Sequence, residues 1–136
     1  MQNQENPLKK IYADYIQDIF ILGEFDKLER YVDPDWTLKS AKAGMKSGKE
    51  VIPDLVNMFR AGFSDFTISL DQLVVEKDWL TCRSTFTGTH SGPFMGLKAR
   101  GNKISMTSFT MIRFRHHKIR ESWVFNDMEA LKNQLS

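Results

Sequence analysis

The sequence predicts an α+β domain in which helices come first and an antiparallel sheet follows. Before Phe63, apolar residues recur at three- and four-residue spacing, which is the period of an amphipathic helix. After Phe63 the period changes to two, which is the period of a strand with one buried face. Helices followed by about four antiparallel strands form an α+β layer pattern. No repeat or linker interrupts residues 1–136, so we expect a single domain.

The helical half has recognisable end signals. Asn6 is placed to cap a helix whose first residue is Pro7, and Gly23 supplies the stop of one long amphipathic segment. Ser47 and Glu50 have the spacing of a capping box in front of a later helix. The remaining elements expected here are a short helix at about 25–32, a short strand at 36–38, a loop at 39–48 and a third helix that ends at Gly62.

The second half is expected to form strands because polar and apolar residues alternate there. Threonine is frequent at 85–89, and threonine favours strands. Glycines then mark a loop that ends near Asn102. A long strand, a tight turn, a last strand and a closing helix follow, at Ile104–Arg115, His116-His117, 118–127 and Met128–Leu135.

The last strand carries the residues that first indicate chemistry. With strict alternation, Glu121, Trp123 and Asp127 point to one face of the sheet. A carboxyl group beside aromatic surface is a candidate for a raised pKa and for proton transfer. If the two histidines form the turn, Thr110 lies opposite Trp123 and Ser108 lies opposite Phe125. Apolar walls with a few hydroxyl groups are the usual lining of a small-molecule pocket.

Composition excludes several classes of protein. The net charge of +2, from 19 basic and 17 acidic residues, is too balanced for binding to nucleic acid or to an anionic membrane. The single Cys82 excludes an internal disulfide and fits a reducing compartment. The first six residues lack the apolar core of a signal peptide, and no apolar run approaches the roughly 18 residues of a membrane span. We therefore expect a cytoplasmic protein.

From residue 78 onward, the order of motifs resembles the SnoaL-like polyketide cyclase and ester cyclase family. The resemblance rests on the segment Gly88-Thr89-His90-Ser91-Gly92, on Phe94-Met95-Gly96, and on Glu121, Trp123 and Asp127 near the end. A weaker match precedes it, including Gly23-Glu24-Phe25 and Phe63-Ser64-Asp65-Phe66, so the resemblance covers nearly the whole chain.

The resemblance implies the cone-shaped fold of nuclear transport factor 2, with a curved antiparallel sheet wrapped around the helices and a pocket open at one end. It also implies a homodimer and no metal or cofactor. Cyclases of this family close a ring by intramolecular aldol condensation, with an aspartate as acid and base. By motif position that aspartate is Asp127. Family members use a histidine on the strand before the last, where this chain offers Ser108 or Thr110.

These considerations predict catalytic residues Asp127, Arg83 and His90. Arg83, or the hydroxyl of Ser108 or Thr110, would hold an enolate oxygen. The expected pocket residues are Glu121, Trp123, Ser108, Thr110, Phe94, Met95, Phe59 and Trp36. Phe109 and Met111 fall on the other face and are assigned to the pocket or to an oligomer interface.

Each of these residues also has a structural alternative. Asp127 directly precedes the closing helix and is placed to cap it. Glu121 could pair with Arg83 as an ion pair on the concave face. His90 could order the end of a strand, and Phe94-Met95 could be either a lid over the pocket or a loop anchored by one buried aromatic ring.

Three functions fit this pattern. The first is a cofactor-independent cyclase or isomerase that performs acid–base chemistry on a small, apolar carbonyl compound. The second is a non-catalytic module of the same fold that binds a small apolar organic ligand. The third is a hydrolase or isomerase relative, which would need a second acidic group, for which Glu121 is the strand-borne candidate.

Overall fold

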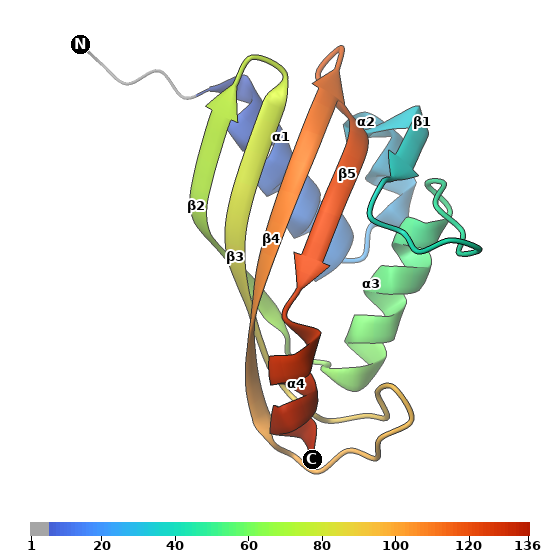
Figure 1. Ribbon diagram of the computed structural model, residues 1–136, viewed down its shortest axis with the longest axis vertical. Helices are drawn as coiled ribbons and strands as arrows, with labels where there is room; N and C mark the ends of the chain where they lie inside the picture. The colour runs from blue at the N-terminus through green and yellow to red at the C-terminus, as the bar shows by residue number, and fades with distance from the viewer. Residues whose placement is uncertain (1–5) are drawn as a thin grey trace.

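The computed structural model describes residues 6–136 and confirms the predicted α+β class (Figure 1). The expectation that the chain starts without a signal peptide rests mainly on Met1–Glu5, which lie outside the described residues. The helices are α1 (Pro7–Tyr15), η1 (Ile16–Ile21), η2 (Phe25–Lys27), α2 (Leu28–Tyr31), α3 (Val51–Gly62) and α4 (Met128–Leu135). The strands are β1 (Val32–Leu38), β2 (Thr67–Glu76), β3 (Trp79–Thr89), β4 (Lys103–Arg115) and β5 (Lys118–Asn126).

The five strands found in residues 6–136 form one sheet in the order β1-β5-β4-β3-β2. β1 runs parallel to β5, and the other neighbours are antiparallel. Figure 1 shows α1 behind the strands, α3 to the right of β5 and below β1, and α4 beside the lower ends of β3 and β4 at the narrow end of the molecule. Among the described residues, no helix combines the length and apolar character that a membrane crossing requires.

The helix start at Asn6 agrees with the sequence prediction. The capping box predicted in front of α3 is not formed. The Asn6 side chain accepts a hydrogen bond from the Leu8 amide at 2.8 Å. The predicted long first helix is helical to Ile21, but its second part, η1, is a π-helix. At α3 the residue before the helix is Glu50, whose side chain makes no capping bond. Backbone bonds from Val51 and Ile52 to the preceding turn replace the capping box.

The core has two parts, one at each end of the cone. The larger part packs α1, η1 and α3 against the sheet and includes Ile19, Val56 and Leu80. The smaller part lies near α4 and is built from phenylalanine rings and the last leucines, Leu131 and Leu135. Because neither part fills the space between α3 and the middle of the sheet, that space remains available for a cavity.

A β-bulge in β5 corrects the predicted faces of this strand. Phe114 pairs with Ile119, whereas Arg113 pairs with Glu121, so Arg120 is an extra residue without a partner on β4. A bulge of one residue reverses the alternation beyond it. The placement of Glu121 and Trp123 on the pocket face was therefore wrong, whereas Phe125, at the end of the strand, lines the rim of the cavity. The residues that face the interior are Ser122, Val124 and Asn126.

The same bulge changes every cross-strand pair predicted for the hairpin beyond its tip. Thr110 lies opposite Val124 rather than Trp123, and Ser108 lies opposite Asn126 rather than Phe125. Trp123 pairs with Met111, which places both side chains on the outer face. The predicted separation of Met111 from Trp123 was therefore also wrong.

Candidate functional site

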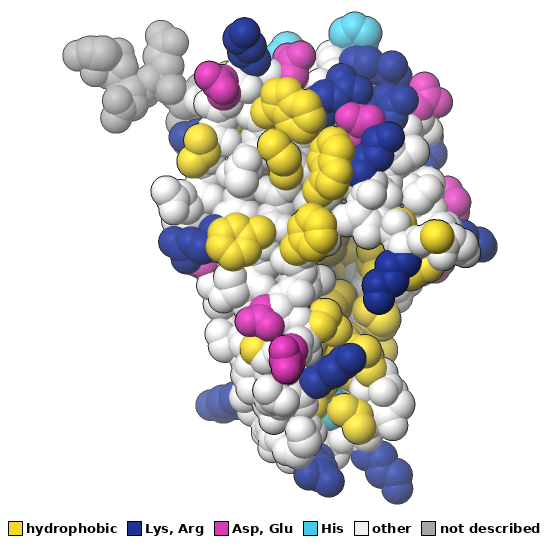
Figure 2. Space-filling model, in the orientation of Figure 1, with side chains coloured by type: hydrophobic (Ala, Val, Ile, Leu, Met, Phe, Trp, Pro, Cys, Tyr) yellow, Lys and Arg dark blue, Asp and Glu magenta, His cyan; other side chains and the backbone are white. Residues whose placement is uncertain are grey.

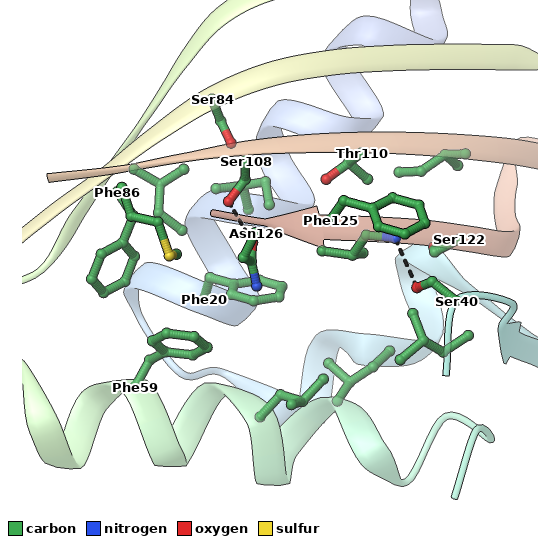
Figure 3. A pocket seen from close by; sticks show the side chains of 18 of the residues that line it. Phe20, Ser40, Phe59, Ser84, Phe86, Ser108, Thr110, Ser122, Phe125 and Asn126 are labelled. Atoms are coloured by element: carbon green, nitrogen blue, oxygen red, sulfur yellow. Dashed lines mark hydrogen bonds between the residues drawn. The ribbon is translucent and has the colours of Figure 1, made fainter. Parts of the chain in front are cut away.

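A cavity of about 550 Å³ lies between the helices and the concave face of the sheet (Figure 3). α1 and η1 form one wall, α3 forms another, and β3, β4 and β5 form the floor. Residues of the 39–48 loop, together with Phe125 and Met128, line the remaining side. The volume falls within the range of about 300–1,000 Å³ that is usual for small-molecule sites.

Most of the cavity wall is apolar or aromatic. Among the aromatic side chains, Phe59 comes from α3, Phe86 from β3 and Phe20 from η1. Trp36, from β1, is buried and donates its indole hydrogen to the Ser122 hydroxyl oxygen at 3.0 Å. Of the residues predicted for the pocket, Phe59 and Trp36 thus line it. Such walls favour a ligand that is itself largely apolar.

Neutral polar groups cross the floor of the cavity. Ser84, Ser108 and Asn126 are directly opposite one another on three neighbouring strands. The Ser108 hydroxyl donates to Asn126 Oδ1 at 2.5 Å. Thr110 and Ser122 supply further hydroxyl groups nearer the wide end. Ser108 and Thr110 were predicted for the pocket, whereas Ser84, Ser122 and Asn126 were not.

Two tyrosines of α1 add buried phenol groups to the wall. Burial raises the pKa of Tyr12, with a smaller contribution from nearby Cys82, and a hydrogen bond with Thr110 opposes the shift. Burial also raises the pKa of Tyr15, and nearby Tyr12 adds to it. Both phenols therefore remain protonated at neutral pH and serve as hydrogen-bonding groups rather than as bases.

No aspartate, glutamate or histidine lines the cavity in the part of the chain that the structure describes. Lys42, in the exposed loop at its edge, is the charged side chain of this lining. Nor do any three His, Cys, Asp or Glu side chains of residues 6–136 gather as metal ligands would. This lining can therefore bind a ligand through its shape, through apolar contacts and through hydrogen bonds from neutral groups.

Asp127 does not lie in the cavity, so the prediction that its carboxyl group points inward was wrong. Its side chain is exposed and accepts a hydrogen bond from the Ala130 amide at 3.1 Å, as an N-cap of α4. The bulge at Arg120 reverses the alternation of side chains in the part of β5 that leads to Asp127. The chain then leaves the sheet and begins α4. The structure therefore supports the alternative interpretation, in which Asp127 caps the closing helix.

Arg83, Glu121 and Trp123 lie on the outer face of the sheet, so the prediction of a concave pair between Arg83 and Glu121 was also wrong. Arg83 lies 3.7 Å from Asp71. Glu121 accepts from Arg113 Nε at 2.7 Å, and this hydrogen bond lowers the pKa of the carboxyl group. Trp123 packs against Trp79 with ring centroids 5.7 Å apart. None of the three predicted residues lines the cavity.

His90 is fully buried in the smaller core, where its ring packs against Phe63 at 5.6 Å between centroids. Neither ring nitrogen has a hydrogen-bond partner among the described residues, although its backbone bonds to Asn102 and Gly101. His90 does not line the cavity, so it is not placed to act as an acid or base there.

The predicted lid is a loop anchored at the narrow end. Phe94 is buried against Phe59 and Phe63, with ring centroids 5.3 and 5.0 Å away, while Met95 is exposed beside it. Neither Phe94 nor Met95 lines the cavity, so their assignment to the pocket was wrong. The alternative interpretation, a loop anchored by one buried aromatic ring, agrees with the structure.

The most distinctive motif, Gly88–Gly92, has a structural role. The Thr89 amide and hydroxyl both donate to the Asp65 carboxylate at 2.8 Å. The Ser64 amide donates to the Ser91 hydroxyl oxygen at 3.1 Å, and a Cβ at Gly92 would lie 2.1 Å from the Ala61 carbonyl oxygen. These contacts join the end of β3 to the turn between α3 and β2. The motif thus stabilises the junction between the end of β3 and the α3–β2 turn, and it supplies no reactive group to the cavity.

The cavity residues that sequence reasoning missed had one available signal. Ser84 interrupts the apolar alternation of Leu80, Cys82 and Phe86 on the inner face of β3. A hydroxyl on an otherwise apolar face suggests a polar position within a pocket. Asn126 had no such signal, because its face depends on the bulge.

A second surface feature is an apolar area on the outer face of the sheet, which Figure 2 shows as a group of yellow side chains. We call it the outer patch; its members are Val74, Trp79, Phe109, Met111, Trp123 and Phe125. Phe109 and Phe125 are directly opposite each other and are 54% and 63% exposed. Exposed aromatic pairs on a sheet face are typical of an interaction surface.

The SnoaL-like polyketide cyclase family model matches residues 10–135. Among solved structures, TsrD from Streptomyces laurentii is 21% identical with a TM-score of 0.85, over 99% of this chain and 98% of that one. A SnoaL-like polyketide cyclase from Agrobacterium tumefaciens is 26% identical with a TM-score of 0.77, over 100% of both chains. IdmH from Streptomyces antibioticus is 26% identical with a TM-score of 0.81, over 96% and 99%. Comparison with curated protein sequences finds no match.

Proposed function

Since this chain belongs to the SnoaL-like polyketide cyclase family, we propose that it binds a small, largely apolar organic molecule that carries ketone or hydroxyl oxygens, and that it holds this molecule folded for ring closure. The observation that carries the proposal is the cavity of about 550 Å³, whose apolar walls enclose one row of neutral hydrogen-bonding groups. A ligand of matching chemistry would bury its rings against the walls and its oxygens against that row.

The proposed contribution to ring closure is conformational and electrostatic. In an intramolecular aldol reaction, an enol carbon bonds to a second carbonyl carbon of the same molecule, and that carbonyl oxygen takes up a proton. Holding both carbons close together can supply a large part of the rate enhancement. Hydrogen-bond donors on the floor would stabilise the enolate or alkoxide oxygen. Because no carboxylate or imidazole of the described lining faces the cavity, the protons would be exchanged with water.

The second candidate is a binding module without turnover, and the absence of an acid–base group from the described lining favours it over a hydrolase or isomerase. A suitable probe is 1-phenylhexane-1,5-dione, which loses one water on aldol closure to give 3-phenylcyclohex-2-enone. The ultraviolet absorbance of the conjugated enone reports turnover. Enone formation above the buffer rate supports the cyclase, whereas binding without enone formation supports the module.

Binding itself is tested with 9-fluorenone, a rigid tricyclic ketone. Trp36 lines the cavity, so saturable quenching of tryptophan fluorescence is expected. Val124→Phe fills the cavity without adding a tryptophan and should weaken binding by at least about 10-fold, since its ring would occupy the site. Met58→Phe, on the exposed side of α3 and outside both the cavity lining and the outer patch, is the matched control and should bind normally. Equal affinity in wild type and Val124→Phe would refute the proposed site.

A homodimer is proposed as well, with a second copy of the chain covering the outer patch. The exposed pair Phe109 and Phe125 supports this, because burying aromatic side chains removes apolar area from water. The double variant Phe109→Glu/Phe125→Glu should be a monomer by sedimentation velocity, whereas the wild type and a Lys98→Glu control should be dimers. A monomeric wild type would refute this part of the proposal.

A further inference from the structure

We infer that Asn126 is the specificity-determining donor of the cavity, and that it recognises a ketone, quinone or enol oxygen located midway along an otherwise apolar ligand. This inference rests on the proposed binding function and adds the position and the chemical type of the recognised group. It assigns no role in proton transfer to Asn126.

The orientation of the Asn126 amide is set by its neighbour on β4. Ser108 Oγ donates to Asn126 Oδ1 at 2.5 Å, which occupies the carbonyl end of the amide. The amide nitrogen is therefore turned the other way. Figure 3 shows the nitrogen directed away from the sheet and into the cavity. Within residues 6–136 no protein group accepts a hydrogen bond from this nitrogen, so its two hydrogens are available to a ligand.

The surroundings of this donor define the type of ligand oxygen. An amide nitrogen only donates, so the ligand must offer an acceptor. The adjacent groups of the row, Ser84 and Ser108, are neutral hydroxyls, and no cation of the described lining lies on the floor of the sheet. A buried carboxylate would remain without a countercharge there, which is costly. A neutral carbonyl or enol oxygen is the acceptor that fits.

The position of the row defines where this oxygen lies along the ligand. On the narrow side, the next inward-facing pair is Phe86 with Met106, and Phe59 lies across from it. On the wide side, Val124 lies beside Thr110, whose hydroxyl interacts with Tyr12. The donor thus has mainly apolar surface on both sides. A ligand with apolar parts on both sides of a central oxygen matches this arrangement.

The test compares two probes with the same tricyclic skeleton, 9-fluorenone and fluorene, which differ in one central carbonyl group. Wild-type protein should bind fluorenone about 3- to 10-fold more tightly than fluorene, the effect of one neutral hydrogen bond. Asn126→Leu should remove this preference while it keeps affinity for fluorene. Asn133→Leu, an exposed asparagine of α4, is the matched control and should keep the preference.

Ser108→Ala tests Ser108 as the positioning residue, because it frees the Asn126 amide to rotate. The ratio of the two affinities should then fall toward one, whereas a purely structural loss would weaken both probes equally and leave the ratio unchanged. A ratio near one in the wild type, or a preference that survives Asn126→Leu, would overturn this inference and leave the proposed binding function standing. If neither probe binds, the proposed binding function fails and this inference with it.

Discussion

Replacement of Asp127 separates the role that the motif suggests from the role that the structure shows. The carboxyl group is exposed and accepts from the Ala130 amide as the N-cap of α4. Asn caps helices about as well as Asp, so Asp127→Asn should change the free energy of unfolding by less than about 0.5 kcal/mol. Asp127→Ala removes the acceptor and should cost about 1 kcal/mol. For a chain of this length, that cost corresponds to a fall in Tm of about 3–5 °C.

The assay combines thermal unfolding with the two ligand measurements. Both variants should bind 9-fluorenone as the wild type does, and both should retain any enone formation from 1-phenylhexane-1,5-dione, because residue 127 lies outside the cavity. Urea unfolding of Asp127→Ala would confirm that the change is one of stability. Loss of turnover or of binding in Asp127→Asn, with an unchanged Tm, would refute the structural reasoning and restore the carboxylate as the acid–base group.

Three further predictions test other parts of the structure. Gly92→Ala places a Cβ 2.1 Å from the Ala61 carbonyl oxygen and should lower the free energy of unfolding by more than about 2 kcal/mol in urea titration. Lys98→Ala, in the same loop, should leave the free energy of unfolding unchanged. Equal urea midpoints for the two variants would contradict the close packing of Gly92 against α3. Arg113 holds the pKa of Glu121 below its ordinary value of 4.5, so the ionised group stabilises the fold above that pH and loses this effect as the pH falls through the lower folded-state pKa. The stability gap between wild type and Glu121→Gln should therefore shrink on acidification, and a gap independent of pH would count against the pairing. Burial raises the pKa of the Cys82 thiol to about 11, so a disulfide reagent at about pH 8 should label it only in urea, and rapid labelling of the native protein would show that the site is open.

Much of the fold followed from short-range signals in the sequence. The cap at Asn6, the polar loop at 39–48 and the closing helix Met128–Leu135 depend on residues within a few positions of one another. The two periodicities separated helices from strands because each reflects the geometry of a single element. The order of motifs also identified the family, although Gly88–Gly92 joins the end of β3 to the α3–β2 turn and does not line the cavity.

The face of the last strand was decided by the tertiary structure. Whether Glu121 and Trp123 or Ser122 and Asn126 face the cavity depends on the one extra residue at Arg120. Arg120 donates to the Asp35 carbonyl oxygen of β1 at 2.6 Å, and the pairing of β1 with β5 shifts register over the same region. A bulge arises where two neighbouring strands impose different registers, so its position depends on partners remote in sequence. Alternation along one strand predicts that a carboxylate and a tryptophan share a face, but only the assembled sheet determines which face that is.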